Sequence, residues 1–322
     1  MKHTVLNLAL LVFGSVAALA QSPTSNNPAV AYQSAGSLFI ATSSGRILKT
    51  VKTVPAIGTF AISRDAQQIM FAPLGKKPDS YGGQLYLLVS PKTAATRLTH
   101  GPYYNKSARS SEVYSNPDFS PDGKQAVFSI HSQSTGDVVE AAGPFATIDL
   151  RSGKVALLDV TLHVPGEAWG TAYADSAYWS PDGSHLLLNF EDGFALTDQS
   201  GKLFENLSSL TTGGDWTSSV GWLGSQCVVY VGGKDYPDSR NHSARILNLK
   251  TRKTLPLDAV LGLGPQQVTD LVAISGRIRV RRQGNELLVE SGSDHWLIPN
   301  GDGHTQIRIF PREPSETPES CR

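Results

Sequence analysis

The sequence of 322 residues contains only two cysteines, carries no net charge and shows no convincing helical periodicity. Two cysteines cannot form the framework of several disulfides that stabilises many small secreted domains. Acidic and basic residues are equal in number, at 28 each, so no basic surface is expected to bind nucleic acid or an anionic membrane. Because apolar residues at helical spacing are missing from the mature chain, the sequence argues against a parallel sheet built from βαβ units.

Motifs for metal binding and nucleophilic catalysis are missing as well. The sequence has no Cys-x-x-Cys, no His-Glu-x-x-His and no Cys/His cluster, which makes a structural zinc site improbable. It has no Gly-x-Ser-x-Gly, so the nucleophile turn of an α/β-hydrolase is absent. Cys227 lies in an apolar stretch and Cys321 in a polar tail, so two unpaired thiols are expected rather than a disulfide. We therefore expect no resident cofactor.

The one long hydrophobic run is at the N-terminus. A positively charged start is followed by an apolar stretch and by Ala18-Leu19-Ala20, a typical cleavage site, so residues 1–20 are predicted to be a signal peptide. The alternative is an N-terminal membrane anchor, although the stretch is short for a membrane span. Gln21, where a lipoprotein would have cysteine, argues against lipidation. The mature chain is predicted to be exported, to a periplasm or outside the cell, with no membrane span.

A short phrase is repeated in the mature chain. Residues 117–128 read PDFSPDGKQAVF, residues 177–188 read AYWSPDGSHLLL, and a degenerate copy at 60–71 reads FAISRDAQQIMF. The aspartates of the three copies are separated by 122 − 65 = 57 and 182 − 122 = 60 residues. A phrase that returns at such intervals indicates a repeat architecture.

Each copy of the phrase has the residues of a β-hairpin. Proline (Pro121, Pro181) favours the second position of a type I turn, and glycine (Gly123, Gly183) allows the positive φ that closes it. Asp122 and Asp182 are expected to bind their own turn backbone rather than a metal. In the degenerate copy Arg64 and Ala66 replace proline and glycine, so a looser turn is expected there. The aromatic residues before two of the turns, Phe119 and Trp179, and Trp222 in a later unit are expected in the core.

Two more short strands follow each hairpin, separated by Gly, Ser, Asp and Lys turns, which predicts an all-β fold of four-stranded antiparallel blades. Residues 29–310 are predicted to form a six-bladed β-propeller, with 282/6 = 47 residues in each blade. The N-terminal unit has only three strands, and residues 305–310 are left over, so strands from both termini are expected to close the ring. Residues 21–28 are predicted to be a flexible leader and residues 311–322 a disordered polar tail.

The repeat resembles that of the TolB β-propeller family. The resemblance rests on TRLTHGPYYN at 96–105 leading into NPDFSPDGKQAVF at 116–128, and it covers roughly residues 55–210. It implies a six-bladed propeller in an exported protein that binds macromolecules or small ligands. The first strand starts near residue 29, so the chain is similar to the TolB propeller without the α/β domain that precedes it in TolB. Similar repeats occur in prolyl-oligopeptidase-type peptidases, but the hydrolase domain of those enzymes has no counterpart here.

Loop length separates the two faces expected of the propeller. Turns between the first and second strands of a blade, and between the third and fourth, are short. Connections between the second and third strands, and between blades, are long and varied, and such loops often carry function on a rigid scaffold. We define the face with these long connections as the loop-rich face, and the opposite one as the short-turn face. The candidate ligand-binding residues are those on the loop-rich face with large or charged side chains: Tyr103, Tyr104, Glu167, Trp169, Asp175, Asp215, Trp216, Asp235, Tyr236, Arg240 and His242.

The expected function is therefore a binding module for a protein, peptide or saccharide on the loop-rich face, in a chain that is more a binder than an enzyme and is expected to be a monomer. The alternatives are a structural ring that docks through its blade edges, and a propeller hydrolase or lyase with a divalent metal such as calcium at the centre of the ring. The metal would be held by acids and histidines of the same loops: His163, Glu167, Asp175, Asp215, Asp235 and His242. Catalytic residues stay unassigned. Three Asn-x-Ser sequons, at Asn105, Asn206 and Asn241, matter only in a host that glycosylates.

Overall fold

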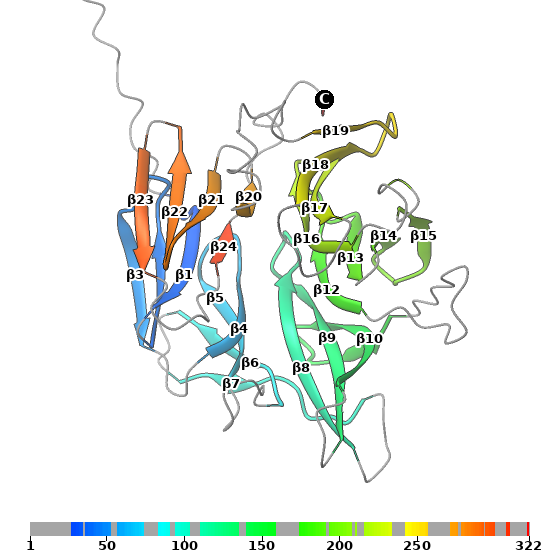
Figure 1. Cartoon of the computed structure of the whole chain (residues 1–322). Coiled ribbons are helices and arrows are strands. Elements are labelled where there is room, and N and C mark those ends of the chain that lie inside the picture. Colours follow the sequence, from blue (N-terminus) through cyan, green and yellow to red (C-terminus); the bar gives the residue numbers. More distant parts are fainter. Residues whose placement is uncertain are drawn as a thin grey trace, which may run out of the picture.

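The protein is a six-bladed β-propeller in which each blade is a four-stranded antiparallel sheet (Figure 1). A computed structural model describes residues 27–34, 36–52, 57–73, 83–90, 94–103, 110–134, 140–158, 174–190, 193–207, 210, 216–233, 242–256, 271–275, 278–292, 294–299, 307–309 and 321. No helix within these ranges is long and apolar enough to cross a bilayer. The predicted fold class, blade number and strand number per blade are confirmed. The signal peptide and the leader up to residue 26 lie outside the described residues and stay predictions.

The blades follow one another along the chain, each running from its innermost to its outermost strand. Blade 2 is β4 (Ile57–Ile62), β5 (Gln68–Pro73), β6 (Tyr86–Val89) and β7 (Thr96–Arg97). Blade 3 is β8 (Ser110–Phe119), β9 (Gln125–Ser134), β10 (Glu140–Asp149) and β11 (Val155–Leu157). Blade 4 is β12 (Ala174–Trp179), β13 (His185–Phe190), β14 (Gly193–Asp198) and β15 (Leu203–Asn206). Blade 5 is β16 (Trp216–Leu223), β17 (Cys227–Gly233), β18 (His242–Asn248) and β19 (Thr254–Pro256). Blade 6 is β20 (Leu271–Ser275), β21 (Ile278–Gln283), β22 (Glu286–Ser291) and β23 (Asp294–Pro299).

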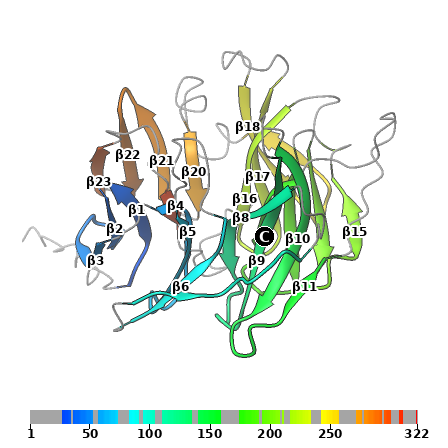
Figure 2. The same cartoon turned by 90° about the horizontal axis from the view of Figure 1, so that it is seen from below.

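Blade 1 joins the two ends of the chain. Its strand order is β24 (Ile307–Ile309), β1 (Val30–Ser34), β2 (Ser37–Ala41) and β3 (Ile47–Lys52). The C-terminal strand β24 pairs with β1 over three residues, Ile307 to Ile309 against Tyr32 to Val30. Figure 2 shows β1–β3 beside β20–β23, so the first and last parts of the chain meet there. The predicted closure by strands from both termini is therefore confirmed, and β24 fills the innermost position.

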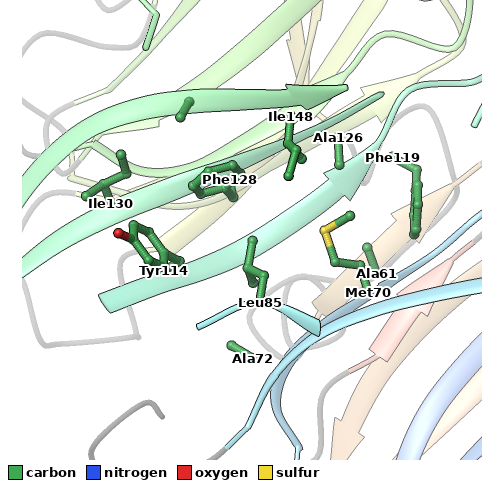
Figure 3. Packing of buried hydrophobic residues seen from close by; sticks show 11 residues of the cluster. Ala61, Met70, Ala72, Leu85, Tyr114, Phe119, Ala126, Phe128, Ile130 and Ile148 are labelled. Atoms are coloured by element: carbon green, nitrogen blue, oxygen red, sulfur yellow. The ribbon is translucent and has the colours of Figure 1, made fainter. Parts of the chain in front are cut away.

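Apolar side chains are buried between neighbouring blades. Between blades 2 and 3, Met70 and Leu85 pack against Tyr114, Phe128 and other residues of β8–β10, as Figure 3 shows. Similar clusters lie between blades 1 and 2, 3 and 4, 4 and 5, and 6 and 1. Because both faces of a blade are covered, its inner strands are apolar throughout rather than alternating, which explains runs such as HLLLNF. The three aromatic residues expected in the core are buried there: Phe119, Trp179 and Trp222.

The repeated phrase forms the expected turn. Gly123 and Gly183 have φ of 67° and 74°, and each donates its N–H to the carbonyl of the serine three residues earlier. Asp122 accepts hydrogen bonds from the Ser120 hydroxyl (2.7 Å) and the Lys124 N–H (3.1 Å), which lower its pKa. The aspartate is thus occupied by its own turn, as predicted.

The expectation of a looser turn in the degenerate copy is wrong. Ala66 adopts φ of 57° and donates its N–H to Ser63 O at 2.7 Å, as the glycines do in the other copies. Asp65 accepts from the Ser63 hydroxyl at 2.6 Å. The serine and aspartate suffice to hold the turn, and alanine is forced into a left-handed conformation that costs about 1–2 kcal/mol.

The two cysteines form a disulfide, which corrects the expectation of two free thiols. Cys227 and Cys321 are 94 residues apart, have Cα atoms 5.7 Å apart and are both buried. Cys227 begins β17 at the short-turn face, and β24 also ends at that face, so the end of β24 and the disulfide lie on one side of the ring. The sequence did not predict this disulfide, because the polar composition of the C-terminal segment does not indicate which residue its one cysteine pairs with. The rest of the predicted disordered tail lies outside the described residues.

Candidate functional site

The eleven candidate residues differ in how far they can be placed. Tyr103 is described in full. For Asp175, Trp216 and His242 the backbone is described, and these residues lie at the starts of β12, β16 and β18 rather than in loops. In an antiparallel blade the first and third strands begin at the same face, so all three lie at the loop-rich face. The other seven lie outside the described residues, and their role stays a prediction: Tyr104, Glu167, Trp169, Asp215, Asp235, Tyr236 and Arg240.

In blade 5 two of these candidates are brought close along the sheet. Trp216 is paired with Gly233, and Gly233 is paired in turn with His242. Neighbouring strands are about 4.8 Å apart, so the backbones of Trp216 and His242 are about 10 Å apart. The two residues therefore share one edge of blade 5 at the loop-rich face.

The innermost strands share an irregularity that the sequence did not reveal. In β4, β8, β12, β16 and β20 the pairing with the next strand shifts by one residue, which is the signature of a β-bulge. In β12 the extra residue is Asp175, between Ala174 and Ser176. Bulges turn side chains away from their regular direction and are common near functional sites. Five of the six blades thus bend their innermost strand.

Blade 3 extends further at the loop-rich face than predicted. β8, β9 and β10 each contain ten residues, so that residues of the expected long connections, such as 110–115 and 131–134, belong to strands. Figure 1 shows β8 and β9 extending beyond the neighbouring strands at the lower edge of the ring.

Tyr103 is held as part of the blade 3 scaffold. Its N–H donates to the Glu112 carboxylate at 2.6 Å, its hydroxyl accepts from the His100 N–H at 2.8 Å, and its ring packs on Tyr114 with centroids 5.6 Å apart. The Tyr114 hydroxyl, fully buried, donates to the same carboxylate at 2.7 Å. Burial and this hydrogen bond raise the pKa of Tyr114. The Tyr103 hydroxyl and backbone are thus engaged within the blade.

A second constellation lies at the centre of the ring, and Arg308 organises it. Arg308 belongs to β24 of blade 1, but its Nε donates to Phe60 O of blade 2 at 2.9 Å. Its Nη2 donates to Pro117 O of blade 3 at 3.0 Å, and its Cζ lies 5.6 Å from the ring centroid of Tyr178 in blade 4. One guanidinium therefore contacts the innermost strands of three other blades.

Asp118 is the acidic member of this constellation. Its carboxylate accepts the Trp179 N–H at 2.9 Å, which links blades 3 and 4. Burial raises its pKa to about 6, although the Arg308 charge and the hydrogen bond act in the opposite direction. Buried carboxyl groups near a specific charge are candidates for functional sites.

Three partly exposed residues on the innermost strands lie next to the buried core aromatic residues. Asp118, Tyr178 and Gly221 each precede the core aromatic residue of their blade, and each is partly exposed. A Cβ added to Gly221 would meet no atom within 4 Å. Trp222, the next residue, donates its indole N–H to Tyr178 O at 3.1 Å, so Gly221 adjoins the Tyr178 strand. We call Asp118, Tyr178, Gly221 and Arg308 the axial cluster.

Sequence reasoning missed the axial cluster. The available signal was the polar or small residue that stands before each core aromatic, in NPDF, AYW and VGW. Arg308 carried no such signal, because only the closed ring brings the C-terminal strand to the centre.

The described residues hold no group of three or more His, Cys, Asp or Glu side chains that could bind a metal ion. The side chains of the six metal candidates are outside the described part of the chain, so a metal at the loops is not tested.

Comparisons with known proteins concern the fold. No family model and no curated protein matches the sequence. Among solved structures, a protein assigned as TolB from Agrobacterium tumefaciens is 18% identical with a TM-score of 0.49, over 71% of this chain and 76% of that one. The Cps50 (Swd1) β-propeller domain from Myceliophteria thermophila is 13% identical with a TM-score of 0.43, over 86% of this chain and 84% of that one. On its own strand topology the chain is a six-bladed β-propeller.

Proposed function

We propose that this protein is a binding module that holds a protein, peptide or saccharide on its loop-rich face. The observation that carries the proposal is the difference in connection length between the two faces. On the short-turn face the strands of blades 2–6 are joined within a blade by at most the six residues 90–95. On the loop-rich face the connections include residues 74–85, 98–109, 158–173 and 257–270, whereas β13–β14 and β21–β22 are joined there by only two residues each, unlike the long connections expected. Closing a blade needs only a short turn, so the extra residues are available for recognition.

The proposal is tested by comparing variants of the two faces. Immobilised peptide and oligosaccharide panels are screened with the wild-type chain and with a loop-face variant, Trp169→Ala/Asp215→Ala/Tyr236→Ala. The matched control replaces three exposed lysines of the short turns: Lys124→Ala/Lys154→Ala/Lys202→Ala. We expect the loop-face variant to lose at least about tenfold in affinity, because truncated aromatic anchors cost 1–2 kcal/mol or more. The control is expected to bind as the wild type does. Loss of binding in the control alone would refute the proposal.

The propeller hydrolase or lyase is the outcome that a metal measurement would favour instead. Purified protein is dialysed against calcium, manganese or zinc, and bound metal is counted with and without Asp175→Asn/His242→Ala. One equivalent that is lost in this variant would point to metal chemistry at the loops and against a simple binding module.

We also propose that the chain is exported. The signal-like residues 1–20 support this, and so does the Cys227–Cys321 disulfide, because disulfides persist in oxidising compartments and are rare in the cytosol. Expression of the whole chain followed by N-terminal sequencing is expected to give a mature protein that begins at Gln21. Retention of Met1 in a reduced, intracellular product would contradict export.

A further inference from the structure

We propose that the axial cluster is a binding site for a single carboxylate group. The inference concerns the centre of the ring and does not depend on ligand binding by the loops. Two hydrogen-bond donors there lack partners among the described residues: Nη1 of Arg308 and the hydroxyl of Tyr178. Both side chains are partly exposed, and the Arg308 guanidinium lies over the Tyr178 ring.

The arrangement holds Arg308 ready to bind. Two of its nitrogens donate to backbone carbonyls of blades 2 and 3, so the plane of the guanidinium is fixed before any ligand arrives. A guanidinium with a free edge is well suited to a carboxylate, and a neighbouring tyrosine hydroxyl can donate a further bond. Little conformational entropy would be lost on binding, because the donors are already positioned.

Space and charge limit what can enter. Gly221 leaves the neighbouring strand without a side chain, and nothing lies within 4 Å of where its Cβ would be. Asp118 already places one carboxylate near Arg308. A doubly charged phosphate would therefore be repelled by Asp118 more strongly than a singly charged carboxylate. These features favour a monocarboxylate, whether it is a small organic acid or the end of a peptide.

Binding is expected to be coupled to a proton. Arg308 is the charged group that acts on Asp118 in the described structure, and burial raises the pKa of Asp118 to about 6. A bound anion disfavours the charged Asp118 carboxylate, so binding takes up a proton and becomes tighter as pH falls through about 6.

The probes are acetate, a blocked tripeptide with a free C-terminal carboxylate, and the same tripeptide as its C-terminal amide. Binding is followed by the ¹H–¹⁵N resonance of the Arg308 Nε–H at pH 5.5 and pH 8. Acetate and the acid peptide are expected to bind more tightly at pH 5.5, and the amide not to bind. If only the acid peptide binds, the site is one for a chain end rather than for any small acid.

Variants distinguish a binding site from a structural contact. Tyr178→Phe keeps the ring under Arg308 and removes one donor, so affinity for acetate is expected to fall about fivefold to tenfold. Tyr86→Phe, a partly buried tyrosine of blade 2, is the matched control and should bind acetate as the wild type does. Asp118→Asn is expected to bind more tightly at pH 8 and to lose the pH dependence. Two results would overturn the proposal. One is equal binding of the acid and amide peptides, and the other is an Arg308 resonance that responds neither to acetate nor to the acid peptide.

Discussion

Removing the disulfide is the most informative perturbation of the fold, because the bond encloses a long segment. The segment from Cys227 to Cys321, which are 94 positions apart, includes most of blade 5, all of blade 6 and β24. In the chain-entropy model, closing a loop of this length destabilises the unfolded state by about 4.7 kcal/mol at 25 °C. We expect Cys227→Ala/Cys321→Ala to lower the free energy of unfolding by about 3–5 kcal/mol. For the 282 residues from 29 to 310, an unfolding entropy of about 2.1 cal/mol/K per residue converts 4.7 kcal/mol to a Tm about 8 °C lower.

The measurement is urea unfolding followed by tryptophan fluorescence. The m-value should rise in the variant, because its unfolded chain is no longer cross-linked and exposes more surface. Reduction of the wild-type protein with a thiol reductant is the control, since it leaves every atom of the cysteines in place. Reduction should reproduce the loss in the wild type and have no effect on the variant. A variant within about 1 kcal/mol of the wild type would show that the unfolded state is not constrained as argued.

Three further predictions test individual positions. Gly101→Ala would place a Cβ within 1.7 Å of the Tyr114 hydroxyl, so the buried hydrogen bond to Glu112 must break, and stability measured in urea should fall by about 2–3 kcal/mol. Gly221→Ala is the control for Gly101→Ala, because nothing lies within 4 Å of the added Cβ, and it should change the free energy of unfolding without ligand by less than about 1 kcal/mol. Similar losses of stability in the two variants would contradict the predicted clash with Tyr114. Ala66→Gly relieves the left-handed alanine and should stabilise by up to about 1 kcal/mol in thermal unfolding, and a loss would refute the strain. The pKa of Asp118 is raised to about 6 from an ordinary 3.8. The free energy of unfolding should therefore increase by about 1–3 kcal/mol as the pH is lowered from 7 to 4.5. Asp118→Asn should remove that rise, and an unchanged pH profile in this variant would assign it to other groups.

The free energy of unfolding increases as the pH falls because the folded protein favours the protonated form of Asp118. The turn carboxylates act in the opposite direction. Ser63 and Ser120 hydroxyls lower the pKa of Asp65 and Asp122, so the stability that these groups supply is lost only as pH falls through their lowered folded-state values. The rise caused by Asp118 is therefore expected above the acid range in which the turns weaken.

Local chemistry made the fold predictable. Serine and aspartate in the repeated phrase hold the same turn in three blades, with glycine after the aspartate in two of them and Ala66 in the third. Even the leftover strand at the C-terminus could be assigned, because an open first blade requires a fourth strand. The turns depend on residues that are near one another in the chain, whereas the closing strand follows from the number of strands in the first blade.

The candidate functional site could be predicted only as one face of the ring, and its role stays a prediction. Loop length indicated a face, and Asp175 and His242 lie at strand ends on that face. Arg308 could not be identified, because its contacts with Phe60 and Pro117 join residues 248 and 191 positions apart. The disulfide was missed for the same reason. Such contacts arise from ring closure, which no local pattern encodes.

The reach of Arg308 also fixes the number of blades. Its guanidinium contacts carbonyls of two blades and the ring of a third at once, which requires a narrow centre. A seventh blade gained by duplication would widen the ring and draw these groups beyond the length of one side chain. The contacts of Arg308 are therefore compatible with a narrow ring only. A related chain with an additional blade would be expected to have another residue at this position.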